Sequence, residues 1–250
     1  MTLAFAPSYE PGDEEVVCMT EPSFEILYED NHCLAVAKPG GVLSTHYAGG
    51  EETLDREVKA YLKEKYHKPG NVFLGIVHRL DRPVSGVLLF ARTSKAAARL
   101  AQQFREGIVE KVYWAIVQGE VLQPAGSLED WLRKDKSHGR VEVLEPREKG
   151  ARQALLHYHR RAVHSGLTWL EVRPQTGRTH QLRVQLAHHG HPIYGDAKYG
   201  AIHTFGRGIG LHARALTFLH PVRYEPITLT AEVPPTWRGR FAYLLREGTR

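Results

Sequence analysis

Segments with strand-like sequence follow one another without a helix between each pair, and this order constrains the fold more than any other feature. Three such segments, 139–145, 152–160 and 167–173, occur in direct succession. A parallel sheet needs a crossover connection between strands, usually a helix, and that regular alternation is missing here. The sequence therefore predicts an α+β fold, with a mixed, mostly antiparallel central sheet and flanking helices.

Periodicity and turn residues define the other expected elements. Further strands are predicted at 26–28, 33–37, 87–91, 111–117, 212–219 and 226–232. Apolar positions at helical spacing predict helices that begin at the caps Thr53 and Ser94, and a third helix from Thr179 to His189 that Gly190 closes. The glycine-rich run 206–210 lacks the lysine and the context of a phosphate loop, so it is expected to be a turn.

Composition and charge limit the class of protein. The 250 residues carry a net charge of +5, which suits a polyanionic partner. Two cysteines without paired spacing, no apolar stretch of about 20 residues and no signal-peptide pattern predict a reduced, cytoplasmic protein with no membrane contact. We expect a flexible extension over residues 1–22, a single domain over 23–250 and a monomer.

The run from His78 to Gly86 places one carboxylate, Asp81, between Arg79 and Arg82, where a loop leads into an apolar strand. Neighbouring guanidinium groups favour the ionised form of a carboxylate. An ionised aspartate serves as a nucleophile or a base without a metal or a histidine to activate it. A structural ion pair at the entrance of a strand would give the same pattern, so this segment alone leaves both interpretations open.

A second segment, from Arg173 to Arg183, combines a glycine turn with the start of a helix. Gly177 permits a tight turn, and the free N–H groups and partial positive charge at a helix start attract an anion. Arg178 and Arg183 add full charges. The segment is a candidate seat for a phosphate or for the Asp81 carboxylate, and a capped amphipathic helix with solvated arginines is the alternative.

The histidines do not indicate a metal site. The chain has 15 of them, and His188, His189 and His191 are close in sequence. Their spacing matches neither the paired histidines of a helical zinc motif nor a Cys/His finger, and no carboxylate shares their helix face. No metal and no other cofactor is therefore expected.

Several ordered segments make the chain similar to the RluA group of pseudouridine synthases. They are HRLD with the later Ser-Gly at 78–86, KVYWAIV at 111–117, GRTHQLR at 177–183, GHPIYGD at 190–196 and LHA at 211–213. The resemblance spans about residues 24–232. It implies a mixed, largely antiparallel sheet with a central cleft. It also implies an isomerase that converts a specific uridine in structured tRNA or rRNA to pseudouridine without a cofactor.

The resemblance also implies roles for individual residues. Asp81 matches the catalytic aspartate, Tyr113 the tyrosine that stacks on the uracil, and Arg178 the basic residue that pairs with the catalytic carboxylate. Five further residues are expected to bind the substrate: His78, Arg79, Arg82, Leu182 and Arg183.

Two of these substrate-binding positions match defined features of the family, and two features of the chain depart from it. Arg79 matches an arginine that helps to hold the target nucleotide flipped out, and Leu182 matches an aliphatic position near the base. Val84 stands where many members have threonine. Many relatives also carry an N-terminal S4-type RNA-binding module, for which the residues before the domain are too few. The basic surface of the domain is therefore expected to hold the RNA.

The reaction breaks the N1–C1′ bond, turns the uracil and joins C5 to C1′, which requires no redox step. Asp81 would attack or stabilise C1′, or abstract a sugar proton, and the residues leave these routes open. Flipping the base costs a few kcal/mol, and stacking on Tyr113 returns about 1–3 kcal/mol. Two alternatives stay open at this point: a non-catalytic RNA-binding or RNA-folding factor that uses the same cleft, and a metal-dependent hydrolase that uses the histidines.

Overall fold

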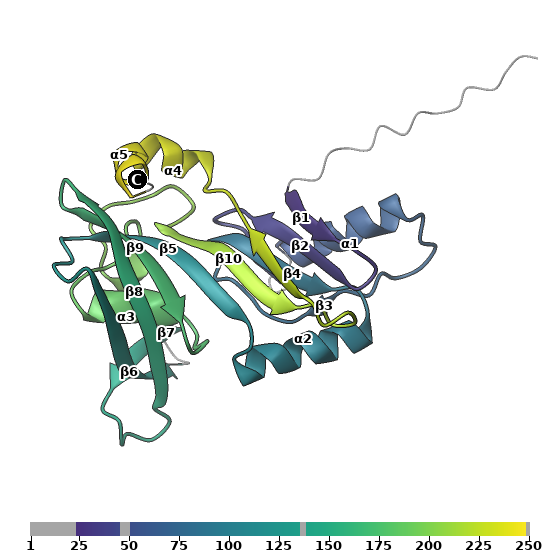
Figure 1. Ribbon diagram of the computed structural model, residues 1–250, viewed down its shortest axis with the longest axis horizontal. Coiled ribbons are helices and arrows are strands. Elements are labelled where there is room, and N and C mark those ends of the chain that lie inside the picture. Colours follow the sequence, from purple (N-terminus) through teal and green to yellow (C-terminus); the bar gives the residue numbers. More distant parts are fainter. Residues whose placement is uncertain (1–23, 46–50, 136–138, 249–250) are drawn as a thin grey trace, which may run out of the picture.

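One sheet of 11 strands runs through the part of the molecule that the structure describes (Figure 1). The computed structural model describes residues 24–45, 51–135 and 139–248, so the extension expected over 1–22 lies outside the described residues. The strand order is β1-β2-β4-β10-β5-β9-β8-β6-β7, with β11 paired to β10 and β3 to β4. The β4–β10 pair is parallel, whereas the other pairs are antiparallel. The predicted mixed, mostly antiparallel sheet is confirmed.

The elements have the following bounds. The strands are β1 (Glu25–Glu29), β2 (Cys33–Lys38), β3 (Gly75–Ile76), β4 (Ser85–Ala91), β5 (Glu110–Gln118), β6 (Ala125–Asp135), β7 (Arg140–Leu144), β8 (Arg152–His164), β9 (Leu167–Pro174), β10 (Leu211–Leu219) and β11 (Pro226–Thr230). The helices are α1 (Leu54–Lys65), α2 (Ser94–Glu106), α3 (Gln181–His188), α4 (Pro235–Arg240) and α5 (Ala242–Glu247), with a 3₁₀ turn η1 (Ala197–Tyr199).

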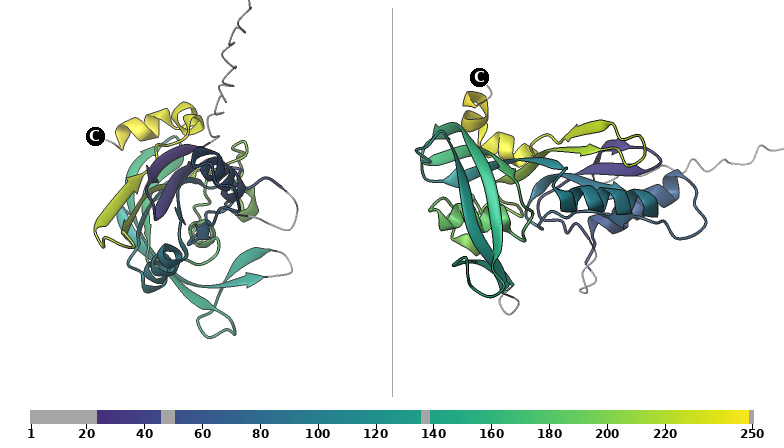
Figure 2. Two further views of the ribbon diagram at one scale, coloured as in Figure 1. Left: turned by 90° about the vertical axis from the view of Figure 1, so that its right-hand side faces the viewer. Right: turned by 60° about the horizontal axis from the view of Figure 1, so that its bottom comes forward.

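Side chains of successive strand residues enter two cores on opposite faces of the sheet. Leu88 and Phe90 of β4 pack with Leu62 of α1 in the first core, to which α3 also contributes. Leu89 packs with Leu100 of α2 in the second core. The short helices α4 and α5 cover β5 and β9 on that second face. Figure 2 shows α1 and α2 at one end of the sheet and α3 at the other. The first face between α1 and α3 therefore lies at the middle of the molecule.

Two helix starts differ from the predictions, and the strands β3 and β6 and the short helices α4 and α5 were not predicted. Thr93, not Ser94, caps α2, because its hydroxyl accepts a hydrogen bond from the N–H of Ala96 at 3.2 Å. The third helix begins at Gln181 and not at Thr179, because His180 adopts a left-handed conformation with φ 50°. Strand β6 carries the buried Asp130 among its inward positions, which breaks the apolar alternation that signals a strand.

The sheet branches next to the short parallel pair of β4 and β10. Their parallel pairing joins only Ser85 and Gly86 to His212 and Ala213. Beyond these residues β4 pairs with β3, and β10 pairs with β11. Gly86 has φ 119°, and a Cβ there would lie 2.2 Å from the Ala213 oxygen, so only glycine fits. Ser85 Oγ lies 2.8 Å from His212 Nδ1. These contacts fix the start of β4 and the loop that precedes it.

We expect the buried His212 to make the fold sensitive to acid. Burial lowers the pKa of His212 to about 4, so the folded protein binds fewer protons than the unfolded chain between about pH 6.5 and pH 4. The free energy of unfolding should therefore decrease as the pH falls through this range, by at most about 1.4 kcal/mol for each pH unit. Urea denaturation at pH 7 and pH 5 measures the change. In His212→Gln the decrease should be smaller, and an equal decrease would contradict the assignment.

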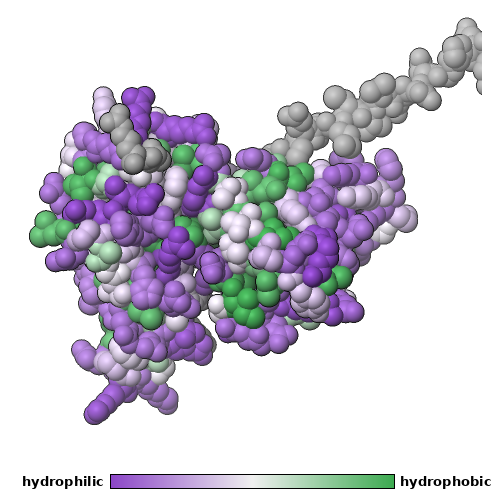
Figure 3. All heavy atoms as spheres, viewed as in Figure 1, coloured by the Kyte–Doolittle hydropathy of each residue, from purple (hydrophilic) through white to green (hydrophobic). Residues whose placement is uncertain are grey.

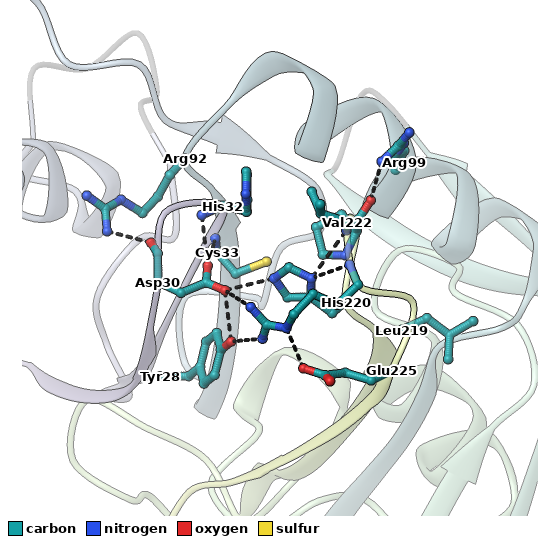
Figure 4. A network of polar contacts seen from close by, with 12 residues as sticks. Tyr28, Asp30, His32, Cys33, Arg92, Arg99, Leu219, His220, Val222 and Glu225 are labelled. Atoms are coloured by element: carbon teal, nitrogen blue, oxygen red, sulfur yellow. Dashed lines mark hydrogen bonds and ion pairs between the residues drawn. The ribbon is translucent and has the colours of Figure 1, made fainter.

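The half-buried carboxylate of Asp30 joins the β1–β2 turn to the β10–β11 turn (Figure 4). Asp30 Oδ1 accepts two backbone N–H groups of its own turn at 2.7 and 2.8 Å. Its Oδ2 accepts hydrogen bonds from His220 Nε2 at 2.7 Å, the Tyr28 hydroxyl at 2.9 Å and the Arg223 guanidinium at 3.2 Å. Burial opposes ionisation, but these hydrogen bonds outweigh it and hold the pKa of Asp30 well below its usual range.

The outer surface is mixed in character. Figure 3 shows apolar patches interrupted by hydrophilic side chains on the face it presents. None of the helices in the described ranges is long and apolar enough to cross a membrane.

Candidate active site

Asp81 lies in the loop between β3 and β4, directly before the point where the sheet divides. Its carbonyl accepts the N–H of Val84 at 3.0 Å, which closes a turn. The carbonyls of Arg82 and Pro83 accept the N–H groups of Gly41 at 2.8 Å and Ile209 at 3.2 Å. Two other loops therefore brace the backbone around Asp81. Its side chain stays 28% exposed, so the carboxylate is held in place and still accessible.

The buried Lys38 of β2 stabilises the loop that carries Asp81. Its Nζ donates to the carbonyl oxygens of Pro39 at 2.9 Å, Val42 at 2.7 Å and Arg82 at 3.1 Å. Burial lowers the pKa of Lys38 to about 7, and the nearby negative charge of Asp81 opposes this shift. Through these bonds β2 fixes the position of the residue next to Asp81.

The cationic partner of Asp81 is Arg183 of α3. Its Nη1 donates to Asp81 Oδ2 at 3.0 Å. Its Nε and Nη2 form a two-pronged pair with the carboxylate of Asp196, at 2.7 and 2.8 Å. Arg183 and Asp196 are 5% and 2% exposed, so the guanidinium is held from both sides in a buried position. Burial opposes the charge of Arg183, but the two carboxylates outweigh it and raise its pKa.

The expected pairing of Arg178 with Asp81 is not what the structure shows. Arg178 is exposed, and its Nε donates to the Gln153 carbonyl at 3.0 Å. His180, in the left-handed conformation, separates the turn from α3. Arg178 therefore belongs to the turn, and Arg183 belongs to the helix that faces Asp81. Arg183, expected to bind substrate, is instead occupied by two carboxylates.

The arginines that flank Asp81 in sequence also point elsewhere. Arg82 donates to the Gly41 carbonyl at 3.1 Å and pairs with Glu51 at 3.2 Å. Arg79 is exposed, and its side chain forms no hydrogen bond or ion pair with the other described residues. The interpretation that adjacent guanidinium groups hold Asp81 was therefore wrong in its detail, because neighbours in an extended loop project in different directions.

His180 is a site residue that sequence reasoning missed. Its Nε2 lies 3.8 Å from Asp81 Oδ2, and its Nδ1 lies 2.7 Å from the hydroxyl of Tyr199. That hydroxyl also accepts the N–H of Val141 at 3.1 Å. Burial lowers the pKa of His180, although the charge of Asp81 opposes this. Its position inside GRTHQLR, between the two arginines, was the signal that could have identified it.

Tyr113 of β5 faces the same side of the sheet as Asp81. It pairs with Ala213 of β10 and Val172 of β9 and packs against the first core. Burial and the negative charge of Asp81 raise the pKa of Tyr113. The phenol is therefore neutral, and it lies close enough to Asp81 for the negative charge to affect its pKa. The structure brings Asp81, Tyr113 and Arg183 together from three different elements.

Two other expected substrate-binding residues pack into the protein. His78 Nε2 accepts the N–H of Leu89 at 2.9 Å, and its ring stacks on Phe104 at 4.7 Å. Burial lowers the pKa of His78 to about 3, so the ring is neutral. Leu182 is 7% exposed within the first core. In this structure His78 therefore stabilises the sheet, through its hydrogen bond to β4 and its contact with α2.

Within the described ranges, one group of side chains has the donor atoms of a possible metal site. Asp30, Cys33 and His220 place them within 4.8 Å of one another. Both carboxylate oxygens of Asp30 already accept hydrogen bonds, and burial raises the pKa of the Cys33 thiol to about 12. A protonated thiol and a saturated carboxylate fit a structural network better than a metal centre.

Comparisons with known proteins agree with the geometry. Residues 32–188 match the family described as RNA pseudouridylate synthase. The chain is 32% identical over 235 residues to an uncharacterized RNA pseudouridine synthase, slr1629, of Synechocystis, covering 92% of this chain and 71% of the relative. It is 33% identical to tRNA pseudouridine synthase C of Yersinia pestis, covering 86% and 88% of the two chains. It is 35% identical to the dual-specificity RNA pseudouridine synthase RluA of Vibrio vulnificus, covering 81% and 80%.

A solved structure supports the fold. The human RNA pseudouridylate synthase domain containing 4 superposes with a TM-score of 0.73 at 24% identity, covering 90% of this chain and 93% of that one. At this level of identity the similarity establishes the architecture.

Proposed function

Because the chain belongs to the RNA pseudouridylate synthase family, we propose that it isomerises a specific uridine in a tRNA or rRNA stem-loop to pseudouridine, with Asp81 as the reacting carboxylate. The observation that carries the proposal is the partly exposed Asp81 carboxylate, held by the buried Arg183 beside the neutral Tyr113. An ionised, oriented and accessible carboxylate is what an attack on C1′ or the removal of a sugar proton requires.

Each residue has a distinct part in this mechanism. Arg183 holds one oxygen of Asp81, which leaves the other free to meet the sugar. Tyr113 provides a ring on which the flipped uracil stacks, and Arg79 provides an unengaged guanidinium near the loop. The hydrogen bond between His180 and Tyr199 holds the imidazole ring with its Nε2 near Asp81. The N1–C1′ bond that breaks and the C5–C1′ bond that replaces it belong to one nucleotide, C5 loses its proton to water and N1 gains one, so the reaction needs no group donor.

The nature of the RNA follows from the relatives and from charge. Relatives named tRNA pseudouridine synthase C and ribosomal large subunit pseudouridine synthase D indicate tRNA and ribosomal RNA as candidate substrates. A net charge of +5 favours a polyanion, and binding that depends on phosphate contacts weakens steeply with salt. We propose a structured stem-loop, because proteins read RNA through its shape and its splayed bases.

Tritium release from RNA labelled at uracil C5 tests this function directly. Formation of pseudouridine replaces the C5–H bond with a C–C bond, so wild-type protein should release tritium with or without a chelator. Binding of RNA without release at any enzyme excess would favour a non-catalytic RNA-binding factor. Loss of activity on chelation would favour the metal-dependent alternative. Mapping pseudouridines in cells with and without the gene would identify the substrate for all later measurements.

We expect Tyr113 to contribute mainly through its ring. Stacking of a base on an aromatic side chain is worth about 1–3 kcal/mol. Tyr113→Leu should therefore lower kcat/KM for tritium release by roughly ten- to hundredfold relative to Tyr113→Phe, which keeps the ring. If the two variants lose activity equally, the hydroxyl and not the stacking face carries the contribution.

A further inference from the structure

Lys111 of β5 carries a charge that no described residue balances. It lies two residues before Tyr113, so both side chains project from the same face of the sheet. Its ammonium group forms no hydrogen bond or ion pair with the other described residues. Burial alone lowers the pKa of Lys111, and no carboxylate opposes the shift, in contrast to Lys38. Lys111 is therefore a partly buried cation that has no counterion among the residues the structure describes.

Two titratable groups near this ammonium group, His78 and Tyr113, are neutral. The positive charge of Lys111 acts on His78, whose buried ring accepts a backbone N–H and is itself uncharged. Tyr113, its neighbour on the strand, is a protonated phenol. Burying an ammonium group without a partner is costly, and proteins normally avoid it. An ammonium group that lacks a counterion among the described residues and lies beside the proposed site can bind an anionic group of the substrate.

Gly177 leaves the approach to this cation open. The only heavy atom near a Cβ built at Gly177 is Lys111 Nζ, at 4.0 Å. Gly177 is not among the glycines with positive φ, so its backbone conformation does not require glycine. The absence of a side chain therefore matters for space: it keeps the turn before α3 clear next to the ammonium group. The exposed Arg178 follows directly and adds a second positive charge.

We propose that Lys111 binds a backbone phosphate of the RNA next to the target nucleotide. The inference rests on the proposed function and names one contact of the same site. Lys111 and Tyr113 are roughly 7 Å apart along the strand, so a single nucleotide can stack on one and place a phosphate on the other. The uracil and the ribose are neutral, and the phosphate is the anionic group that every nucleotide carries. A phosphate contact positions the nucleotide without reading its sequence.

The salt dependence of binding tests the proposal. Binding is measured with the inactive Asp81→Asn protein and a transcript of the stem-loop that contains the mapped uridine. Loss of one phosphate contact should make the slope of log Kd against log salt shallower by about 1. Lys111→Met should show this change and weaken binding roughly ten- to hundredfold at low salt. Lys111→Arg should keep most of the slope, and Lys63→Met, an equal loss of charge on the exposed face of α1, should leave it unchanged.

The outcomes separate this inference from the proposed function. If wild-type protein releases tritium but Lys111→Met keeps the full salt slope, the phosphate contact is wrong and the proposed function stands. A fall in kcat of Lys111→Met in the active background with an unchanged slope would assign Lys111 to the reaction step and would also overturn the inference. If wild-type protein releases no tritium from any RNA, the proposed function fails first. Gly177→Val, which fills the approach, should weaken binding as Lys111→Met does.

Discussion

Replacing Asp81 by asparagine should reduce tritium release by at least about a thousandfold while the protein stays folded and bound to RNA. Asparagine has the same shape but lacks the negative charge needed to attack or to abstract, and losses of this size follow removal of a reacting group. The fold should tolerate the change, because Arg183 keeps both bonds to Asp196. Single-turnover release under enzyme excess measures the chemical step apart from product release.

The matched control for this experiment is Glu64→Gln, the same loss of charge on the exposed side of α1. It should change neither activity nor binding. Residual activity of Asp81→Asn within tenfold of wild type would show that another group performs the reaction. Loss of RNA binding in the same variant would show that the carboxylate loop serves binding instead.

Arg183→Met should have the largest effect on stability among the site residues. The substitution leaves the Asp196 carboxylate, 2% exposed, without its two hydrogen bonds and removes the cation from Asp81. Breaking a buried ion pair from one side costs about 3–5 kcal/mol. Chemical denaturation should show a loss of that size in the free energy of unfolding. Activity should fall at least about a hundredfold even at temperatures where circular dichroism shows the variant folded, because Asp81 loses its orientation.

Arg178→Met is the control that separates the two arginines of the same motif. Its guanidinium is exposed and donates to one carbonyl, so the free energy of unfolding should change by no more than about 0.5 kcal/mol. Any loss of activity should appear as weaker RNA binding. If Arg178→Met lowers turnover more than Arg183→Met does, Arg178 pairs with Asp81 during the reaction, as the resemblance implies. The ion pair between Arg183 and Asp81 would then be specific to the free protein.

Several parts of the fold follow from local sequence. Apolar alternation predicted the hairpin of β1 and β2 and the inner strand β5, because side chains of successive strand residues enter opposite cores. Gly107 ends α2 with φ 73°, as a glycine after a helix predicts. Strand β6 was missed because the buried Asp130 there is satisfied by Gln185 and His189, which lie far away in sequence.

The segments of the proposed site were predicted from the sequence alone, because Asp81 and Tyr113 occur in motifs whose order and residue types are specific. What it did not determine is which charges meet. Arg183 is 102 residues from Asp81, and the left-handed backbone at His180 decides that this arginine faces the carboxylate while Arg178 faces solvent. That no described residue supplies a counterion to Lys111 likewise depends on which elements pack around it. Charge pairing and burial depend on distances between elements, and only the tertiary structure sets those distances.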